Sequence, residues 1–156
     1  MKLRAYVDQD AAATMSVFER AIRITASRDY TTEQINAWVS TGLDSLDALT
    51  WAAARAAAVT IVAVEDEQVV GFSDLVDGSL LDMLFVDPDV SRRGIGAALV
   101  GRIVCLARKA GACTLETYAS LTSRPLFERF GFVIVDRCTP VVRGVAMTNF
   151  KMRLAL

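Results

Sequence analysis

The chain has 156 residues, of which 53% are hydrophobic and 22% are charged, and its formal net charge is −1. This composition is typical of one ordered globular domain over residues 1–156 and excludes a disordered chain. The near-neutral charge gives no bulk attraction to nucleic acid, and no apolar run approaches the ~20 residues of a membrane span, so neither partner is expected.

The first third of the chain is predicted to hold a strand and three helices. The strand covers residues 2–7, and the helices cover residues 8–27, residues from 31 onward, and residues 44–57. Asp8 or Asp10 is expected to cap the first helix. Thr31 and Gln34 fit a capping box at the start of the second.

The remaining elements are predicted from alternating and helical apolar patterns. Strands are expected at residues 59–64, 68–75, 80–86, 113–118, 132–138 and 145–154, and helices at about 97–110 and at 121–130. Gly111 and Gly131 follow the two helices, as glycine commonly does at a helix end. This order indicates an α/β fold in which a mixed sheet carries helices on both faces.

The most informative stretch is a dense apolar strand, Leu80–Val86, followed by a loop with two arginines and two glycines, Arg92–Gly96. Helix N-termini present unpaired N–H groups, glycine lets a ligand approach the backbone, and arginine suits phosphate. A phosphate-bearing ligand is therefore expected. The chain has no Gly-Lys-Ser/Thr of a P-loop, and Leu99 takes the third glycine position of dinucleotide-binding loops, which argues against that class.

The segment Ser91–Gly96 resembles the acyl-CoA loop of the GNAT (Gcn5-related) N-acetyltransferases, Gln/Arg-x-x-Gly-x-Gly/Ala, from which Ser91 departs. A second block, Pro125–Phe132, resembles the later helix of that family and its Gly-Phe ending. Asp82–Pro88 and the tail 143–150 resemble a bacterial YafP-type branch. The resemblance implies a mostly antiparallel twisted sheet, acetyl-CoA as donor with CoA as product, and a primary amine of a small molecule or peptide as acceptor.

The resemblance also assigns the cofactor site. The backbone of Leu84–Val86 would pair with the pantetheine arm, and amides at the start of the helix would hold the pyrophosphate. The cofactor-binding residues are expected to be Leu84, Phe85, Val86, Ser91, Arg92, Arg93, Gly94, Ile95, Gly96, Ala97 and Phe127. The alternative interpretation is a glycine-rich turn with surface arginines.

The sequence contains no histidine. Serine–histidine mechanisms and histidine-ligated metal sites are therefore excluded, and no metal is expected. Three cysteines without paired spacing, Cys105, Cys113 and Cys138, favour a reduced, cytoplasmic setting.

The general base must be sought among other groups. A lysine-like amine has a pKa of about 10.4, so roughly one molecule in a thousand is neutral at neutral pH. Asp82 is the leading candidate, because it is the only charged residue inside Leu80–Val86 and burial there would raise its pKa. The alternative is an aspartate bonded to a loop amide. Glu116, in the neighbouring strand, is a weaker candidate.

The leaving thiolate has no obvious proton donor. The family often places a tyrosine four residues before the Gly-Phe glycine, and that position is Phe127 here. Tyr118 is the candidate replacement, with a half-buried structural aromatic as the alternative. A second hypothesis follows from Phe127, namely a non-catalytic acyl-CoA-binding sensor or partner-binding domain.

The acceptor pocket is expected between the first two helices and the C-terminal strands. Its candidate residues are Tyr30, Trp38, Arg143 and Asn149. Asp82 and Glu116 would suit a cationic amine. The apolar strand Val145–Leu154 leaves a homodimer open, because it could pair or pack across an interface.

Overall fold

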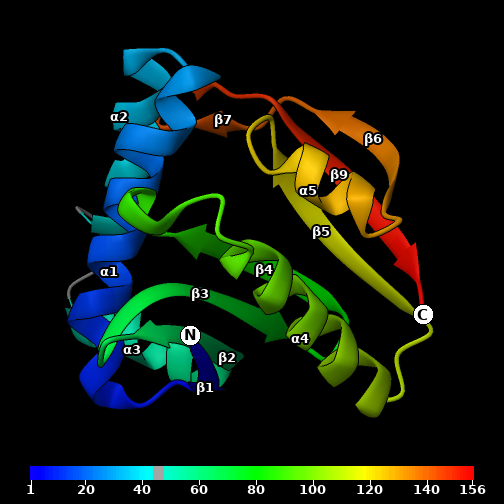
Figure 1. Ribbon diagram of the computed structural model, residues 1–156. Coiled ribbons are helices and arrows are strands. Elements are labelled where there is room, and N and C mark those ends of the chain that lie inside the picture. The colour runs from blue at the N-terminus through cyan, green and yellow to red at the C-terminus, as the bar shows by residue number, and fades with distance from the viewer. Residues whose placement is uncertain (44–47) are drawn as a thin grey trace.

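A computed structural model describes residues 1–43 and 48–156 of the protein (Figure 1). The chain forms a seven-stranded sheet in the order β1-β2-β3-β4-β5-β9-β6, with helices on both faces. Neighbouring strands run antiparallel except for the parallel pair β4–β5. This confirms the predicted fold of a mixed, mostly antiparallel sheet.

The elements follow the predicted order. The strands of the main sheet are β1 (Lys2–Ala5), β2 (Val59–Glu65), β3 (Gln68–Val76), β4 (Leu80–Val86), β5 (Thr114–Ser120), β6 (Val133–Cys138) and β9 (Asn149–Ala155), and β7 (Val141–Val142) pairs with β8 (Val145–Ala146). The helices are α1 (Ala11–Arg20), α2 (Thr32–Leu43), α3 (Ala48–Ala57), α4 (Ile95–Lys109) and α5 (Arg124–Arg129). None of the helices in the described residues is long and apolar enough to cross a membrane.

The first two predicted helices are confirmed. Short helical turns at residues 8–10 and 21–28 extend α1 on both sides, which matches the predicted helix at 8–27. The capping box is present, because the Thr31 amide donates to Gln34 Oε1 (2.9 Å) and the Gln34 amide donates to Thr31 Oγ1 (3.2 Å). The predicted start of the third helix at residue 44 lies outside the described residues.

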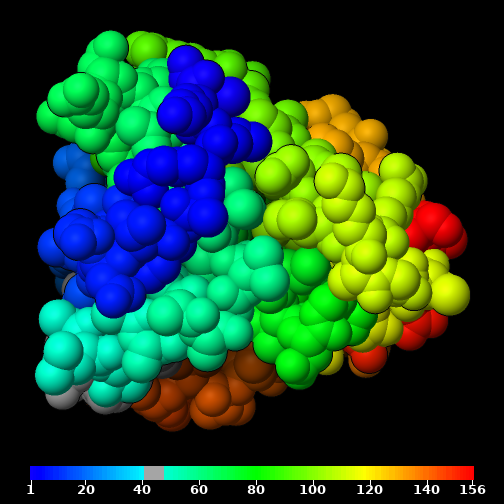
Figure 2. Space-filling view, turned by 90° about the horizontal axis from the view of Figure 1, so that it is seen from below, coloured from blue at the N-terminus to red at the C-terminus, as the bar shows by residue number. Residues whose placement is uncertain are grey.

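Two hydrophobic clusters fill the two faces of the sheet. On one face Phe72 and Val62 pack with residues of α1, α2 and α3, and on the other Ile61 and Leu81 pack against α4. Successive side chains of β2, β3 and β4 point to opposite faces of the sheet, so each of these strands can contribute residues to both clusters. From below, the N-terminal segment (blue) and the turquoise chain of α3 and β2 lie on one side of the molecule, and the C-terminal end of α4 (yellow-green) lies on the other (Figure 2).

The centre of the sheet is split. Strands β4 and β5 pair only at Leu80↔Glu116 and Leu81↔Thr117, and then they diverge (Figure 1). The edge of β4 beyond Leu81 therefore has no strand partner on the β5 side. Backbone groups left unpaired in this way can bind an extended ligand as if it were another strand.

The predicted strand Val145–Leu154 is wrong as one unit, because it is divided into β8 and β9. Side chains from the α2 region hold the segment between them. Gln34 Nε2 donates to Ala146 O (3.0 Å), and the Tyr30 hydroxyl donates to Thr148 O (2.6 Å). Since β9 lies between β5 and β6, both of its edges are paired, and it is not available to pair with a second copy.

The helix predicted at residues 121–130 begins later, at Arg124. A turn precedes it in which the Ser120 amide donates to Ser123 Oγ and the Ser123 amide donates to Ser120 Oγ, both at 3.0 Å. These reciprocal bonds satisfy the backbone without a helix, and they fix Ser120 and Ser123 beside the split.

Candidate active site

The loop before α4 presents a row of amide groups. Arg92 has φ 65° and Gly94 has φ 84°, so the backbone turns through the left-handed region twice. The first helical bond runs from the Ala98 amide to Gly94 O (2.9 Å). Among the described residues, the amides of 92–97 have no hydrogen-bond partner. Such a concave row of N–H groups at a helix start binds anions.

A groove of about 560 Å³ runs along this loop. It is lined by most of the predicted cofactor residues: Leu84, Phe85, Val86, Ser91, Arg92, Gly94, Ile95, Gly96 and Ala97. Arg93 is not among its lining residues. Its side chain is exposed, and its Nη1 lies 3.8 Å from Glu65 Oε2. The groove also contains residues that sequence reasoning missed, including Thr25, Ser123 and Arg129.

The β4 edge of the groove offers two further donors. The Met83 amide donates to Asp74 Oδ1 and the Asp87 amide donates to Val70 O, both at 2.8 Å and both towards β3. Because amide directions alternate along a strand, the amides of Leu84 and Val86 point to the opposite edge, which is the open side of the split. This orientation fits the predicted pairing of β4 with a pantetheine arm.

Gly96 leaves room at the narrow part of this groove. A Cβ at this position would lie 3.1 Å from Leu126 Cδ2 and 3.8 Å from Val86 Cγ2. Even a methyl group at this position would therefore require the Leu126 side chain on α5 to shift. The open amides and this bare backbone together fit the pyrophosphate and pantetheine of acetyl-CoA.

The entrance of the loop is fixed by an ion pair. Arg20 on α1 donates to Asp87 Oδ2 (3.1 Å) and to Asp89 Oδ2 (2.7 Å). Burial alone would raise the pKa of Asp87, but hydrogen bonds from Arg20 and from the Asp89 amide bring that pKa below its ordinary value. The carboxylate stays charged and holds α1 against the loop.

A second cavity of about 280 Å³ opens at the split. Its wall contains many aromatic and sulfur-containing side chains: Phe18, Tyr30, Trp38, Trp51, Met83, Phe85, Tyr118, Phe127 and Met147. It shares Trp38, Leu84, Phe85, Ser120 and Ser123 with the cofactor groove. The two spaces therefore meet between β4 and β5, where a donor group in one can reach an acceptor in the other.

Asp82 lines this second cavity, but the burial expected for it is not observed, because its side chain is exposed. The reason is the split, which removes the strand that would have covered it. Glu116 lines neither space. Arg153 donates to Glu116 (2.6 Å) and, with Lys151 at 3.5 Å, holds the pKa of that carboxyl below its usual range. Such a paired carboxylate does not suit a general base.

Two aromatic candidates are also located. Tyr118 lines the second cavity and is 51% exposed, so the residue borders both the cavity and solvent. Phe127, predicted to bind the cofactor, lines the second cavity and not the groove. It is 2% exposed and packs edge-on against Phe132 at 5.2 Å, which explains its apolar character.

The four acceptor-pocket candidates differ in position. Tyr30, Trp38 and Asn149 line the second cavity, and Arg143 does not. Arg143 instead donates to Ser40 O (3.3 Å) from an exposed turn. The hydroxyl of Tyr30 is occupied, since it donates to Thr148 O and accepts from the Leu121 amide (2.9 Å). Asn149 Oδ1 is buried and has no hydrogen-bond partner among the described residues.

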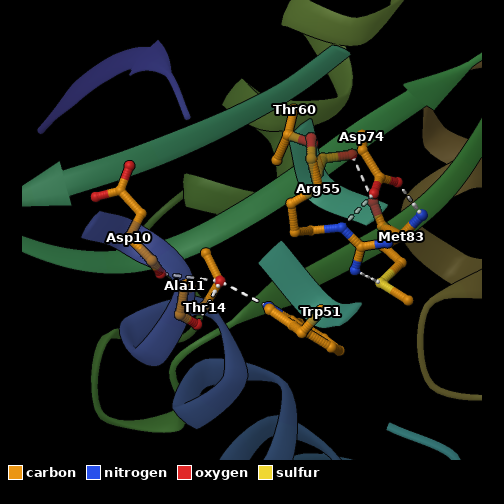
Figure 3. Close-up of polar contacts among 9 residues, drawn as sticks. Asp10, Ala11, Thr14, Trp51, Arg55, Thr60, Asp74 and Met83 are labelled. Carbon is orange, nitrogen blue, oxygen red and sulfur yellow. Dashed lines mark hydrogen bonds and ion pairs between the residues drawn. The ribbon is translucent and has the colours of Figure 1, made fainter. Parts of the chain in front are cut away.

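A buried ion pair beside the cavity was missed by the sequence analysis. Arg55 Nε on α3 lies 3.1 Å from Asp74 Oδ2 on β3 (Figure 3). Burial raises the pKa of Asp74 to about 6, against the attraction of Arg55 and with a further rise from Asp82. The sequence contained an indication of this buried carboxyl, because Asp74, like Asp82, is the one charged residue of an otherwise largely apolar strand.

Comparison with known proteins agrees with this geometry. A sequence profile of the Acetyltransferase (GNAT) domain matches residues 26–154. The chain is also 35% identical to the uncharacterized N-acetyltransferase YafP of Escherichia coli strain K12, over 98% of this chain and 95% of YafP. The chain belongs to the GNAT acetyltransferase family. This GNAT protein is therefore an acetyltransferase, and enzymes of this family use acetyl-CoA as the acetyl donor.

Solved GNAT structures share the fold. A GCN5-related N-acetyltransferase from Rhodopseudomonas palustris superposes with a TM-score of 0.94 at 33% identity, covering 99% of this chain and 95% of that one. YncA from Salmonella typhimurium, solved with acetyl-CoA, has a TM-score of 0.71 at 22% identity, covering 99% and 93%. At that lower identity the likeness shows the fold alone.

Proposed function

We propose that this GNAT protein transfers the acetyl group of acetyl-CoA directly to a primary amine of a small molecule or peptide. The observation that carries the proposal is the junction of the two spaces at the split of the sheet, with open amides on one side and a carboxylate on the other. The amine nitrogen would bond to the acetyl carbon as the carbon–sulfur bond breaks, the amine losing a proton and CoA leaving as thiolate.

In this proposal, backbone amide groups provide most of the contacts that bind acetyl-CoA. Amides of Arg92 through Ala97 bind the pyrophosphate, and the amides of Leu84 and Val86 bind the pantetheine arm. Arg92 and Arg129, which line the groove, add charge for the phosphates. Preorganised donors of this kind require no reorganisation when the charged ligand binds.

The acceptor side is suited to an amine with an apolar body. Aromatic walls provide contact area for that body, and Asp82 is a carboxylate in the cavity wall that attracts the ammonium form. Since Asp82 is open to water, it can take a proton from the amine and release it to solvent. Arg55 also lines the cavity, but Asp74 offsets its charge.

Calorimetric titration with acetyl-CoA, using NAD and ATP as controls, tests the donor. A thiol-release assay over a panel of primary amines tests the reaction. Selective binding of acetyl-CoA with amine-dependent thiol release supports the proposal. Binding without thiol release for any amine would favour an acyl-CoA-binding sensor, and preference for NAD would favour a nucleotide-binding protein.

Asn149→Ala is expected to raise the KM for the amine about tenfold with little change in the KM for acetyl-CoA, because the buried Oδ1 is placed to accept an amine N–H. Steady-state kinetics with both substrates varied measures this. Asn149→Asp, which keeps an oxygen at that position, is the matched variant and should bind the amine better than Asn149→Ala does. An unaltered amine KM in Asn149→Ala would contradict the role.

Tyr118→Phe tests the proton donor for the leaving thiolate. We expect kcat to fall by at least about tenfold with unchanged KM values, because Phe127 has no hydroxyl and Tyr118 lies at the split. Single-turnover kinetics would place the loss in the chemical step. A wild-type kcat would mean instead that the thiolate leaves without a protein donor.

A further inference from the structure

The strand pairing between β3 and β4 is interrupted beside the active site. The register shifts between Ser73 and Leu75, which leaves Asp74 without a partner residue on β4. Asp74 thus lies opposite two residues of β4, Asp82 and Met83, and a bulge normally leaves backbone groups of the strand with the extra residue unpaired. Here side chains of β3 replace the missing backbone hydrogen bonds to Met83. Asp74 Oδ1 accepts from the Met83 amide (2.8 Å), and Ser73 Oγ donates to Met83 O (2.7 Å).

Arg55 completes this arrangement from α3. Its Nε lies 3.1 Å from Asp74 Oδ2, and its Nη1 contacts Met83 Sδ at 2.7 Å. The guanidinium also lies over the Trp51 ring, 4.7 Å from its centre. Figure 3 shows Arg55 reaching both Asp74 and Met83. Asp74 is 0% exposed and Arg55 is 5% exposed, so the pair is held away from water.

Stability alone does not explain a pair of this kind. Moving two charges from water into the protein interior costs about as much free energy as their mutual attraction provides. Apolar residues of the same volume would often stabilise the fold equally well. Hydrogen bonds to a buried charge do fix geometry closely. The geometry fixed here is that of the Met83 backbone, immediately before the Leu84 amide that faces the open side of the split.

We propose that Asp74 and Arg55 are positioning residues for acetyl transfer, which hold the Met83 backbone so that the amides of Leu84 and Val86 face the acetyl-CoA groove. The inference rests on the proposed function for the identity of the ligand. Neither residue needs to touch the donor. Their effect passes through Met83, which lines the acceptor cavity and directly precedes the donor-binding amides.

The test compares acetyl-CoA dissociation constants of full-length variants by calorimetry. Asp74→Ala removes the acceptor for the Met83 amide and should raise the dissociation constant tenfold or more. Asp74→Asn keeps an oxygen at that position and should restore binding to within about threefold of wild type. Thr14→Ala is the control. It breaks the bond from Trp51 Nε1 to Thr14 Oγ1 (3.0 Å), which lies in the same buried network but does not contact β4.

The control separates positioning from general destabilisation. Thr14→Ala is expected to lower the melting temperature and leave the dissociation constant unchanged. Wild-type affinity in folded Asp74→Ala would overturn the inference. If Asp74→Ala does not fold, Ser73→Ala decides, with a threefold or larger loss supporting the inference and unchanged binding overturning it. Failure of the wild type to bind acetyl-CoA would instead refute the proposed function.

Discussion

Asp82→Asn is expected to lower kcat/KM for the amine about 100-fold or more, while the dissociation constant for acetyl-CoA stays unchanged. Asp82 lines the acceptor cavity and not the cofactor groove, so the two effects should separate. Asparagine has nearly the same shape but cannot take a proton from the ammonium form. The neutral amine would then have to come from the roughly one in a thousand molecules present at neutral pH.

Kinetics from pH 6 to 9, together with calorimetry, measure this prediction. Asp77→Asn is the matched control, because Asp77 is an exposed aspartate in the turn between β3 and β4 and does not line either space. Its φ of 49° is a conformation that asparagine tolerates. If turnover of Asp82→Asn equals that of wild type over this whole range, Asp82 is not the base.

The pH profile also separates Asp82 from Asp74. The pKa of Asp74 is raised to about 6 by burial, and the negative charge of Asp82 contributes to that rise. Removing the charge at Asp82 should therefore move the pKa of Asp74 downward. An acid limb that persists in Asp82→Asn but shifts to lower pH would point to Asp74. A loss of turnover of the same size at every pH would point to Asp82.

The two aspartates show where sequence reasoning succeeded and failed. Strand Leu80–Val86 was predicted with its observed bounds, because a dense apolar run ends at Asp87-Pro88. The environment of Asp82 within it was not predicted, because burial depends on neighbouring strands. Strand β5 pairs with only Leu80 and Leu81, so Asp82 is exposed. A buried acid of the sheet is instead Asp74, which the sequence does mark as a lone charge in an apolar strand. The register shift beside it depends on the pairing of β3 with β4, which no local pattern indicates.

The backbone of the cofactor loop was easier to predict because it depends on local chemistry, whereas the binding roles of its residues stay predictions. The glycines and the helix start lie next to each other in the chain, and the amides of 92–97 are open as expected. Contributions from distant elements were missed. Arg129 and Thr25 enter the groove only through tertiary packing, and β9 lies between β5 and β6 through long-range pairing. Phe127 was predicted to bind the cofactor, and its side chain lines the second cavity and not the groove.

Gly96→Leu is expected to weaken acetyl-CoA binding by about 100-fold or more, close to loss of measurable affinity. Even a Cβ would lie 3.1 Å from Leu126 Cδ2, so the larger side chain has to turn into the groove or displace the Leu126 side chain, which also lines the groove. Either outcome removes space beside the Val86 edge, where the donor is expected to lie. Calorimetry with acetyl-CoA measures the loss, and circular dichroism with thermal melting shows whether the fold is kept.

Gly101 provides the matched position for this test. It lies in the same helix, outside both spaces, and a Cβ there would be 3.9 Å from Phe130, which is ordinary contact. Gly101→Ala should therefore bind acetyl-CoA as wild type does, whereas Gly96→Ala should already bind several-fold more weakly. An unaltered dissociation constant in folded Gly96→Leu would place the donor elsewhere on the protein. A loss confined to position 96 would place the donor between α4, β4 and α5.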